Sequence, residues 1–309
     1  MDRRMDNKIV LVTRKTRLED LVARYNTVNQ AKFYIEHLGA DFSDYVREHD
    51  TYHACVRDAD SALRHFGRVQ MVERGFLPNF LFGPGDLVVA LGQDGLVANT
   101  MKYLDGHPLV GVNPDPARWD GVLLPFQVRD LAKLMPDVLA RRRTMQEVTM
   151  ARARLNNGQE LYGVNDIFIG PKSHTSARYT IRLGDREERQ SSSGIIISTG
   201  LGSTGWLKSL QVGAAAIAAG GGAWQTHEQV TPWDADYLHF TVREPFPSKA
   251  SAASLVAGRI GARVSLTLVS AMAENGVVFS DGIEADYLEF NAGITVEVGI
   301  AEKRGYLVI

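Results

Sequence analysis

The chain has 309 residues, of which 45% are hydrophobic and 23% charged, a composition typical of folded globular proteins that excludes a mainly disordered chain. Lys and Arg total 34 against 36 Asp and Glu, so the formal net charge of −2 lacks the basic surplus typical of nucleic-acid-binding proteins. The single cysteine, Cys55, excludes an intramolecular disulfide framework and Cys-x-x-Cys zinc or redox motifs. We therefore expect a cytoplasmic protein with no nucleic-acid partner and no membrane partner.

The first half of the sequence alternates segments typical of strands with segments typical of helices. Two largely apolar runs, 9–13 and 86–91, predict strands that are buried on both faces. The other elements predicted here are helices over 18–28, 29–48, 58–66, 96–104 and 127–142, and a strand over 109–112.

The second half has a different pattern, with short apolar strands and frequent turns. Residues 145–155 alternate in period two, and Asn156-Asn157-Gly158 is a favourable hairpin turn. One helix is expected from about 203 to 218. Further strands are predicted over 178–183, 194–198, 237–242, 264–269, 277–280 and 294–298. This pattern is typical of an antiparallel sheet or sandwich, so we predict an α/β domain over 1–143 and a β-rich domain over 144–309.

A glycine-rich turn, Gly92-Gln93-Asp94-Gly95, follows the second buried strand and precedes a helix. Such a turn exposes backbone N–H groups and the positive end of the helix, which together suit a phosphate. Asp94 would stand at the carboxyl edge of the sheet, where it could serve as a general base or help to hold Mg²⁺. Asp-Gly is also an ordinary turn pair, and the turn matches neither a P-loop nor a dinucleotide fingerprint.

Two adjacent polar residues, Asn165 and Asp166, interrupt the apolar segment 163–169. Neighbouring carboxamide and carboxylate groups can hydrogen-bond the paired hydroxyls of a ribose, whereas the plainer interpretation is an Asx turn or a bulge. A second late candidate is Asp281-Gly282, whose plainer interpretation is a hairpin turn.

The segment 198–206 leads from a strand through a turn rich in glycine and hydroxyl groups into a helix. Ser203 or Thr204 could cap that helix. Alternatively, the turn offers N–H and hydroxyl donors to a nucleotide, and Trp206 offers a stacking face. Ser203 as a hydrolase nucleophile would need a GxSxG elbow, which its neighbours do not supply.

His49 and His53 are four residues apart with Asp50 nearby, a spacing that could place two metal ligands on one helix face. No third ligand is evident from the sequence, so we predict no metal site built from protein residues.

In their order and spacing, these motifs resemble those of the NAD kinase family, whose members phosphorylate the 2′-hydroxyl of the adenosine ribose of NAD to give NADP. Residues 92–95 stand where the family has Gly-Gly-Asp-Gly, Asn165-Asp166 match its Asn-Glu/Asp pair, and 199–206 resemble its Gly-Ser-Thr-Ala-Tyr segment. Asp281-Gly282 resembles its late Asp-Gly turn. The resemblance is greatest to the branch that includes mitochondrial NAD kinases, through 111–116, 164–170 and 242–245.

This resemblance implies a Rossmann-like α/β domain followed by a β-rich, sandwich-like domain, with the nucleotide site in the cleft between them. It further implies NAD as the substrate, ATP as the phosphate donor, Mg²⁺ as the metal ion and a homodimer or larger homo-oligomer. Asp94 would be the catalytic base that activates the 2′-hydroxyl. The residues that would bind the nucleotides are Gly92, Gln93, Gly95, Asn165, Asp166, Ser203, Thr204, Trp206 and Asp281.

Two other functions stay open at this point. Gln93 replaces the second glycine of the family motif, which favours an NAD(H)- or NADP-binding sensor that transfers phosphate weakly or not at all. A related kinase could act instead on a lipid or sugar, although the pair Asn165-Asp166 favours a nucleotide acceptor.

Overall fold

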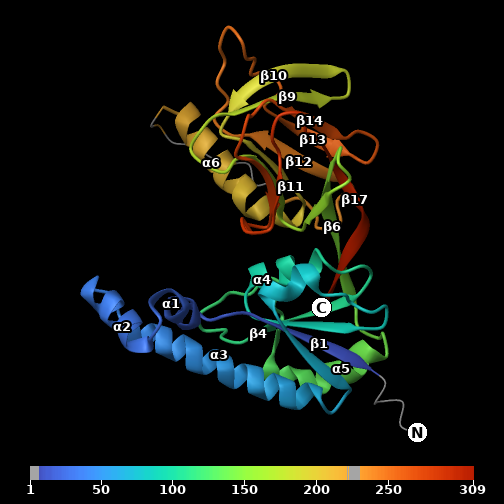
Figure 1. Cartoon of the computed structure of the whole chain (residues 1–309). Coiled ribbons are helices and arrows are strands. Elements are labelled where there is room, and N and C mark those ends of the chain that lie inside the picture. The colour runs from blue at the N-terminus through green and yellow to red at the C-terminus, as the bar shows by residue number, and fades with distance from the viewer. Residues whose placement is uncertain (1–6, 221, 223–229) are drawn as a thin grey trace. The chain divides into compact units, whose positions relative to one another are not determined.

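The computed structural model describes residues 7–220, 222 and 230–309, and the chain divides into two compact units (Figure 1). Unit 1 comprises the chain up to Gln146 together with Tyr306–Ile309, and unit 2 comprises Glu147–Gly305. Two strands carry the chain from one unit to the other, β6 (Met145–Leu155) outward and β17 (Thr295–Val308) back. Unit 2 is therefore an insertion between the main part of unit 1 and its last four residues.

Unit 1 is built on a parallel sheet with the strand order β2 (Arg68–Glu73), β1 (Lys8–Thr13), β3 (Leu87–Leu91) and β4 (Pro108–Asn113). The short β5 (Phe126–Gln127) and the last part of β17 also pair with β4 in parallel. Strands β1, β3 and β4 are almost entirely buried, as their continuous apolar sequences require of strands that are covered on both faces.

Helices cover both faces of this sheet (Figure 1). Two of them, α3 (Phe42–Leu63) and α5 (Leu131–Leu139), pack buried side chains against β1, β3 and β4 on one face. On the opposite face lies α4 (Asp94–Met101). The remaining helical elements are α1 (Arg17–Tyr25), α2 (Val28–His37) and 3₁₀ turns at Arg74–Asn79 and Val128–Asp130.

The helix expected over 29–48 is interrupted in the structure. Gly39, at φ +78°, follows the end of α2, and Asp41 caps the start of α3 by accepting a hydrogen bond of 2.8 Å from the Ser43 N–H. From there α3 runs unbroken to Leu63. The prediction of one helix over 29–48 and another over 58–66 is therefore wrong. The break between helices lies around Gly39, and residues 42–63 form a single helix.

Unit 2 is a sandwich of two sheets. One sheet contains β10 (Arg186–Ser192), β9 (Ala177–Leu183), β14 (Leu266–Ser270) and β17, with β6 pairing β17 and β7 (Glu160–Gly163) pairing β6. The other is antiparallel, in the order β13 (Ala257–Gly261), β12 (Tyr237–Val242), β11 (Ile195–Ser198), β8 (Asp166–Pro171), β15 (Gly276–Ser280), β16 (Tyr287–Glu289).

The core of unit 2 lies between these sheets and is filled by apolar side chains from both. On the outer face of the second sheet lies α6 (Trp206–Ala218), where Trp206 and Leu210 pack against Phe168, Val277 and Phe279. The predicted fold class, a Rossmann-like α/β part and a sandwich-like β part, is confirmed. Among the described residues, no helix is both long enough and apolar enough to cross a membrane.

Candidate functional site

Asn165 and Asp166 lie where β7 passes into β8, and the turn that follows the neighbouring strand β15 braces them. The carboxylate of Asp281 in that turn accepts hydrogen bonds from the backbone N–H groups of Val164 (3.0 Å) and Asn165 (2.6 Å). Its own N–H donates to the Asp166 carbonyl oxygen at 3.0 Å. Asp281 takes the left-handed conformation with φ +53°, uncommon for a residue with a Cβ. The Asp-Gly turn thus holds the backbone of the Asn-Asp pair in place.

The loop between β11 and α6 is drawn against the same pair by close backbone packing. A Cβ on Gly202 would lie 2.0 Å from the carbonyl oxygen of Asn165, so this position has room only for glycine. The Thr199 hydroxyl donates to the Val164 carbonyl oxygen at 2.6 Å and accepts from the Gly202 N–H at 3.1 Å. These contacts explain the sequence Thr199-Gly-Leu-Gly202 in terms of packing.

The start of α6 differs from the plainer interpretation of its sequence. Gly205 occupies the N-cap position, and within the described residues no side chain caps the helix. Ser203 is buried and donates to the Gly200 carbonyl oxygen at 2.7 Å, while Thr204 is exposed. The first N–H groups of this 13-residue helix are therefore not capped by Ser203 or Thr204, and its positive end suits an anionic group.

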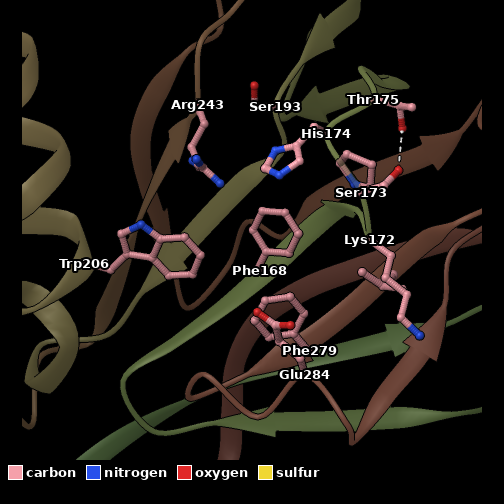
Figure 2. A pocket seen from close by; sticks show the side chains of 12 residues that line it. Phe168, Lys172, Ser173, His174, Thr175, Ser193, Trp206, Arg243, Phe279 and Glu284 are labelled. Atoms are coloured by element: carbon pink, nitrogen blue, oxygen red, sulfur yellow. Dashed lines mark hydrogen bonds between the residues drawn. The ribbon is translucent and has the colours of Figure 1, made fainter. Parts of the chain in front are cut away.

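Trp206, the first residue of α6, presents an aromatic surface beside this helix end. Its indole stacks on Phe168 with ring centroids 5.8 Å apart and an angle of 14° between the planes. The guanidinium of Arg243 lies 5.5 Å from the indole centroid. Figure 2 shows the two side chains next to each other. The aromatic pair is thus fixed on one side by the sheet and is polarised by a nearby cation.

These elements enclose a hollow of about 350 Å³. It is lined by Asn165, Asp166, Leu201, Gly202, Thr204, Gly205, Trp206, Asp281 and Gly282. The structure therefore brings together five of the predicted nucleotide-binding residues, Asn165, Asp166, Thr204, Trp206 and Asp281. Ser203 is not among the lining residues, since its hydroxyl turns inward.

Asp166 is the unusual group in this hollow. Only 7% of it is exposed, and its Oδ1 has no hydrogen-bond partner among the described residues. Burial, aided by the negative charge of Asp281, raises the pKa of Asp166 to about 7. A buried acceptor without a donor is costly, so the site fits a ligand that brings hydroxyl or other N–H or O–H donors.

A second hollow of about 360 Å³ adjoins the first through Trp206 (Figure 2). Its lining combines the rings of Phe168 and Phe279 with the side chains of Lys172, His174 and Arg243. The sequence pattern does not single these residues out, because basic residues just after strands are common on exposed surfaces. Only the folded sheet shows that they share a hollow with Trp206.

The glycine-rich turn of residues 92–95 lies in unit 1, between β3 and α4. Asp94 is the first residue of α4, and its Oδ1 accepts a hydrogen bond from the Leu123 N–H at 2.8 Å, its Oδ2 one from the Val122 N–H at 3.3 Å. Gln93 has φ −116°, which any residue can adopt. Gly95 is exposed, and among the described residues no atom lies within 4 Å of where its Cβ would be. Gly92, by contrast, is buried, and its N–H donates to the Val112 carbonyl oxygen at 3.1 Å. The turn therefore exposes backbone at Gly95, next to a carboxylate that already accepts two hydrogen bonds.

Comparison with known proteins bears on the fold. No family model matches the sequence, and no curated protein matches it either. The structure is similar to the crystal structure of an NAD kinase from Archaeoglobus fulgidus in complex with ATP, with a TM-score of 0.58 and 16% identity, over 98% of this chain and 93% of that one. It is also similar to yeast NADH kinase complexed with NADH, with a TM-score of 0.56 and 15% identity, over 98% of this chain and 83% of that one.

Fold and hollow together define a two-unit protein in which an α/β unit carries a glycine-rich turn and a β-sandwich carries a polar hollow with an aromatic lining residue. That fold is the fold of the NAD and NADH kinases. The structural likeness confirms the fold that the sequence motifs predict, whereas the closer resemblance to the mitochondrial branch stays a prediction.

Proposed function

We propose that the chain is an ATP-dependent NAD kinase that phosphorylates the 2′-hydroxyl of the adenosine ribose of NAD to give NADP. The observation that carries this proposal is the buried carboxylate of Asp166. This residue lines a hollow together with Asn165 and Trp206, and its Oδ1 has no hydrogen-bond partner among the described residues. The hydroxyls of a ribose are donors of the kind that this oxygen lacks. The fold, shared with an NAD kinase in complex with ATP and an NADH kinase complexed with NADH, supports the same substrates.

In this proposal the residues of unit 2 bind and orient the dinucleotide. Asn165 and Asp166 hold ribose hydroxyls, Asp281 keeps both residues in place through their backbone, and Trp206 offers its ring to a base. The exposed Thr204 and the N–H groups at the start of α6 then face the polar part of the ligand. Catalysis of phosphoryl transfer consists mainly of such positioning and of charge neutralisation.

The residues of the glycine-rich turn act on the reacting groups. Asp94 accepts the proton of the 2′-hydroxyl as it attacks, while the backbone of Gly92, Gln93 and Gly95 approaches the phosphates of ATP. Carboxylate and phosphate oxygens are the donors that Mg²⁺ prefers, so Asp94 fits a role beside a nucleotide-bound ion. When bound, Mg²⁺ neutralises charge on the transferred phosphate.

The test is mass-spectrometric detection of NADP formed from NAD, ATP and Mg²⁺, with NADH and polyphosphate in parallel reactions. We expect NADP from the wild type and a loss of about 10²–10⁴-fold in turnover in Asp94→Asn, with NAD binding retained. Asp130→Asn is the matched control, because Asp130 also accepts a backbone N–H, that of Gln127 at 2.8 Å. Near-normal turnover in Asp94→Asn would remove Asp94 from the catalytic role.

One observation favours a second function, a dinucleotide sensor that does not transfer phosphate. Both carboxylate oxygens of Asp94 accept backbone hydrogen bonds. A carboxylate bonded in this way can have a purely structural role, without acting as a base. Calorimetric binding of NAD by a preparation that forms no NADP would establish the sensor. Absence of both product and binding would contradict both functions.

A further inference from the structure

A cluster of imidazole and carboxylate groups lies in unit 1 and shares no residue with the sites described above. His49 and His53 project from the same side of α3, with ring centroids 4.3 Å apart. The fold adds what their sequence spacing lacks, because Glu19 of α1 approaches them and its Oε1 lies 3.1 Å from Nε2 of His53. One ligand atom from each of the three residues can be chosen such that all lie within 4.8 Å of one another.

The buried residue Thr16 orients two members of this cluster. As the N-cap of α1 it donates its N–H to Oε2 of Glu19 at 2.7 Å, so that Oε1 is left to face the histidines. The Thr16 hydroxyl lies 3.2 Å from the same Oε2 and 2.9 Å from Nδ1 of His49. With the hydroxyl donating to Glu19, its oxygen accepts the Nδ1–H of His49, and Nε2 of His49 then carries a free lone pair. Ligand histidines in metal sites are oriented by outer hydrogen bonds of this kind.

The two arginines closest to Thr16 in the sequence do not pair with Glu19. The guanidinium groups of Arg14 and Arg17 both bind the buried Glu48, and Arg17 also binds Asp44. An ion pair with Glu19 would account for His53, since both side chains are 36% exposed. The hydrogen bond to Thr16 occupies Nδ1 of His49, and neither contact uses Nε2 of His49.

We propose that Glu19, His49 and His53 form a three-ligand site for a divalent transition-metal ion, with Zn²⁺ as the preferred occupant. Two imidazoles and one carboxylate are ligands that Zn²⁺ takes in tetrahedral sites with one position open to solvent. Mg²⁺ prefers an all-oxygen set and is not expected to compete.

The ion would fasten α1 to α3 close to the carboxyl ends of two strands. Tyr52, next to His53, donates its hydroxyl to the carbonyl oxygen of Leu91, the last residue of β3, at 2.9 Å. The same hydroxyl accepts the N–H of Arg14, the residue after β1, at 2.9 Å. Since an unfolded chain does not hold the three ligands together, binding would raise the stability of unit 1.

The experiment titrates chelator-treated, full-length protein with Zn²⁺ by calorimetry and with Co²⁺ by absorption spectroscopy, in the presence of excess Mg²⁺. We expect one equivalent of Zn²⁺ to bind, tetrahedral ligand-field bands with Co²⁺, and a higher melting temperature with Zn²⁺.

Three variants test the ligands. Glu19→Gln keeps a residue that can complete the capping box of α1, so its fold is maintained while the carboxylate ligand is lost. We expect Glu19→Gln, His49→Ala and His53→Ala each to weaken Zn²⁺ binding by more than about 100-fold, beyond the effect of losing an outer partner. His65→Ala removes an exposed histidine just beyond α3 and should change nothing. Failure of the wild type to bind Zn²⁺, or equal binding by Glu19→Gln, would overturn the site.

Discussion

Asp166 makes the stability of unit 2 depend on pH. Its carboxyl group is buried next to the negative charge of Asp281, which raises its pKa from 3.8 to about 7. Between these two pH values the folded chain therefore binds more protons than the unfolded chain. The free energy of unfolding must then fall as the pH rises through this window.

Asp166→Asn removes this charge and should flatten the dependence. We expect the free energy of unfolding of the variant to exceed that of the wild type by on the order of 1–4 kcal/mol at pH 8, and by much less at pH 4. Urea unfolding at both pH values measures the difference. Asp185→Asn, at an exposed position of the same unit, is the control. An equal difference at both pH values would show that burial of Asp166 is not the cause.

A substitution at Gln93 tests whether a glycine at this position of the turn is important for NADP formation. Its φ of −116° carries no strain, so its side chain affects function only through what it touches. We expect Gln93→Gly to retain or raise NADP formation, because it uncovers backbone that, in the proposed function, approaches the phosphates of ATP. Steady-state kinetics with NAD and ATP measure this, and a sharp loss of turnover would show instead that the Gln93 side chain contacts a substrate.

At the scale of elements, close backbone approaches at Gly200 and Gly202 hold the loop that precedes α6, and the one at Gly202 is against the Asn-Asp pair. Gly202→Ala would press a methyl group onto the Asn165 carbonyl oxygen, 2.0 Å away, and displace the loop from the Asn-Asp pair. We expect a loss of about 1–3 kcal/mol in the free energy of unfolding and weaker NAD binding.

A matched substitution lies in the helix that follows this loop. Gly213 is inside α6, and among the described residues no atom lies within 4 Å of where its Cβ would be. Gly213→Ala should therefore raise the free energy of unfolding by about 0.5–1 kcal/mol without changing NAD binding. Chemical denaturation and calorimetry on both variants separate the two effects, and destabilisation by both would indicate a general intolerance of the loop and helix.

The elements that the sequence predicts correctly are mainly buried ones, because their burial requires an apolar composition that can be recognised in the sequence. The runs that form β1, β3 and β11 are apolar except at the ends of β1 and β11, because both of their faces are covered. Strands β2 and β10 are missing from the prediction, since each is an edge strand with charged and polar residues on both faces. An edge strand is held by backbone hydrogen bonds to one neighbouring strand. Its own side-chain pattern does not show which strand that neighbour is.

The same contrast holds for the two sites. The sequence names Asn165, Asp166 and Trp206, because polar residues inside an apolar strand and an aromatic residue after a glycine turn are unusual in themselves. It does not show that Ser203 turns inward, nor that Glu19 meets two histidines some thirty residues away along the chain. Both depend on how one element packs against another, which single-sequence patterns do not encode.

At the scale of the whole molecule, β17 ties the end of the chain into unit 1. Leu307 is 1% exposed and pairs with Leu109 of β4. We expect Leu307→Ala to cost about 2–5 kcal/mol and to reduce hydrogen-exchange protection chiefly in β1, β3 and β4. Leu268→Ala, in the core of unit 2, is the matched control and should reduce protection in the sandwich strands. The reverse pattern would contradict the division of the chain into these units.

This division also sets an order of events during translation. Residues 306–309 are synthesised after the whole of unit 2, yet they supply a strand to the sheet of unit 1. A nascent chain on the ribosome would hold β4 without this partner until the sandwich had been made. Although domains commonly fold in the order of their synthesis, the unit that emerges first is here the last to be completed.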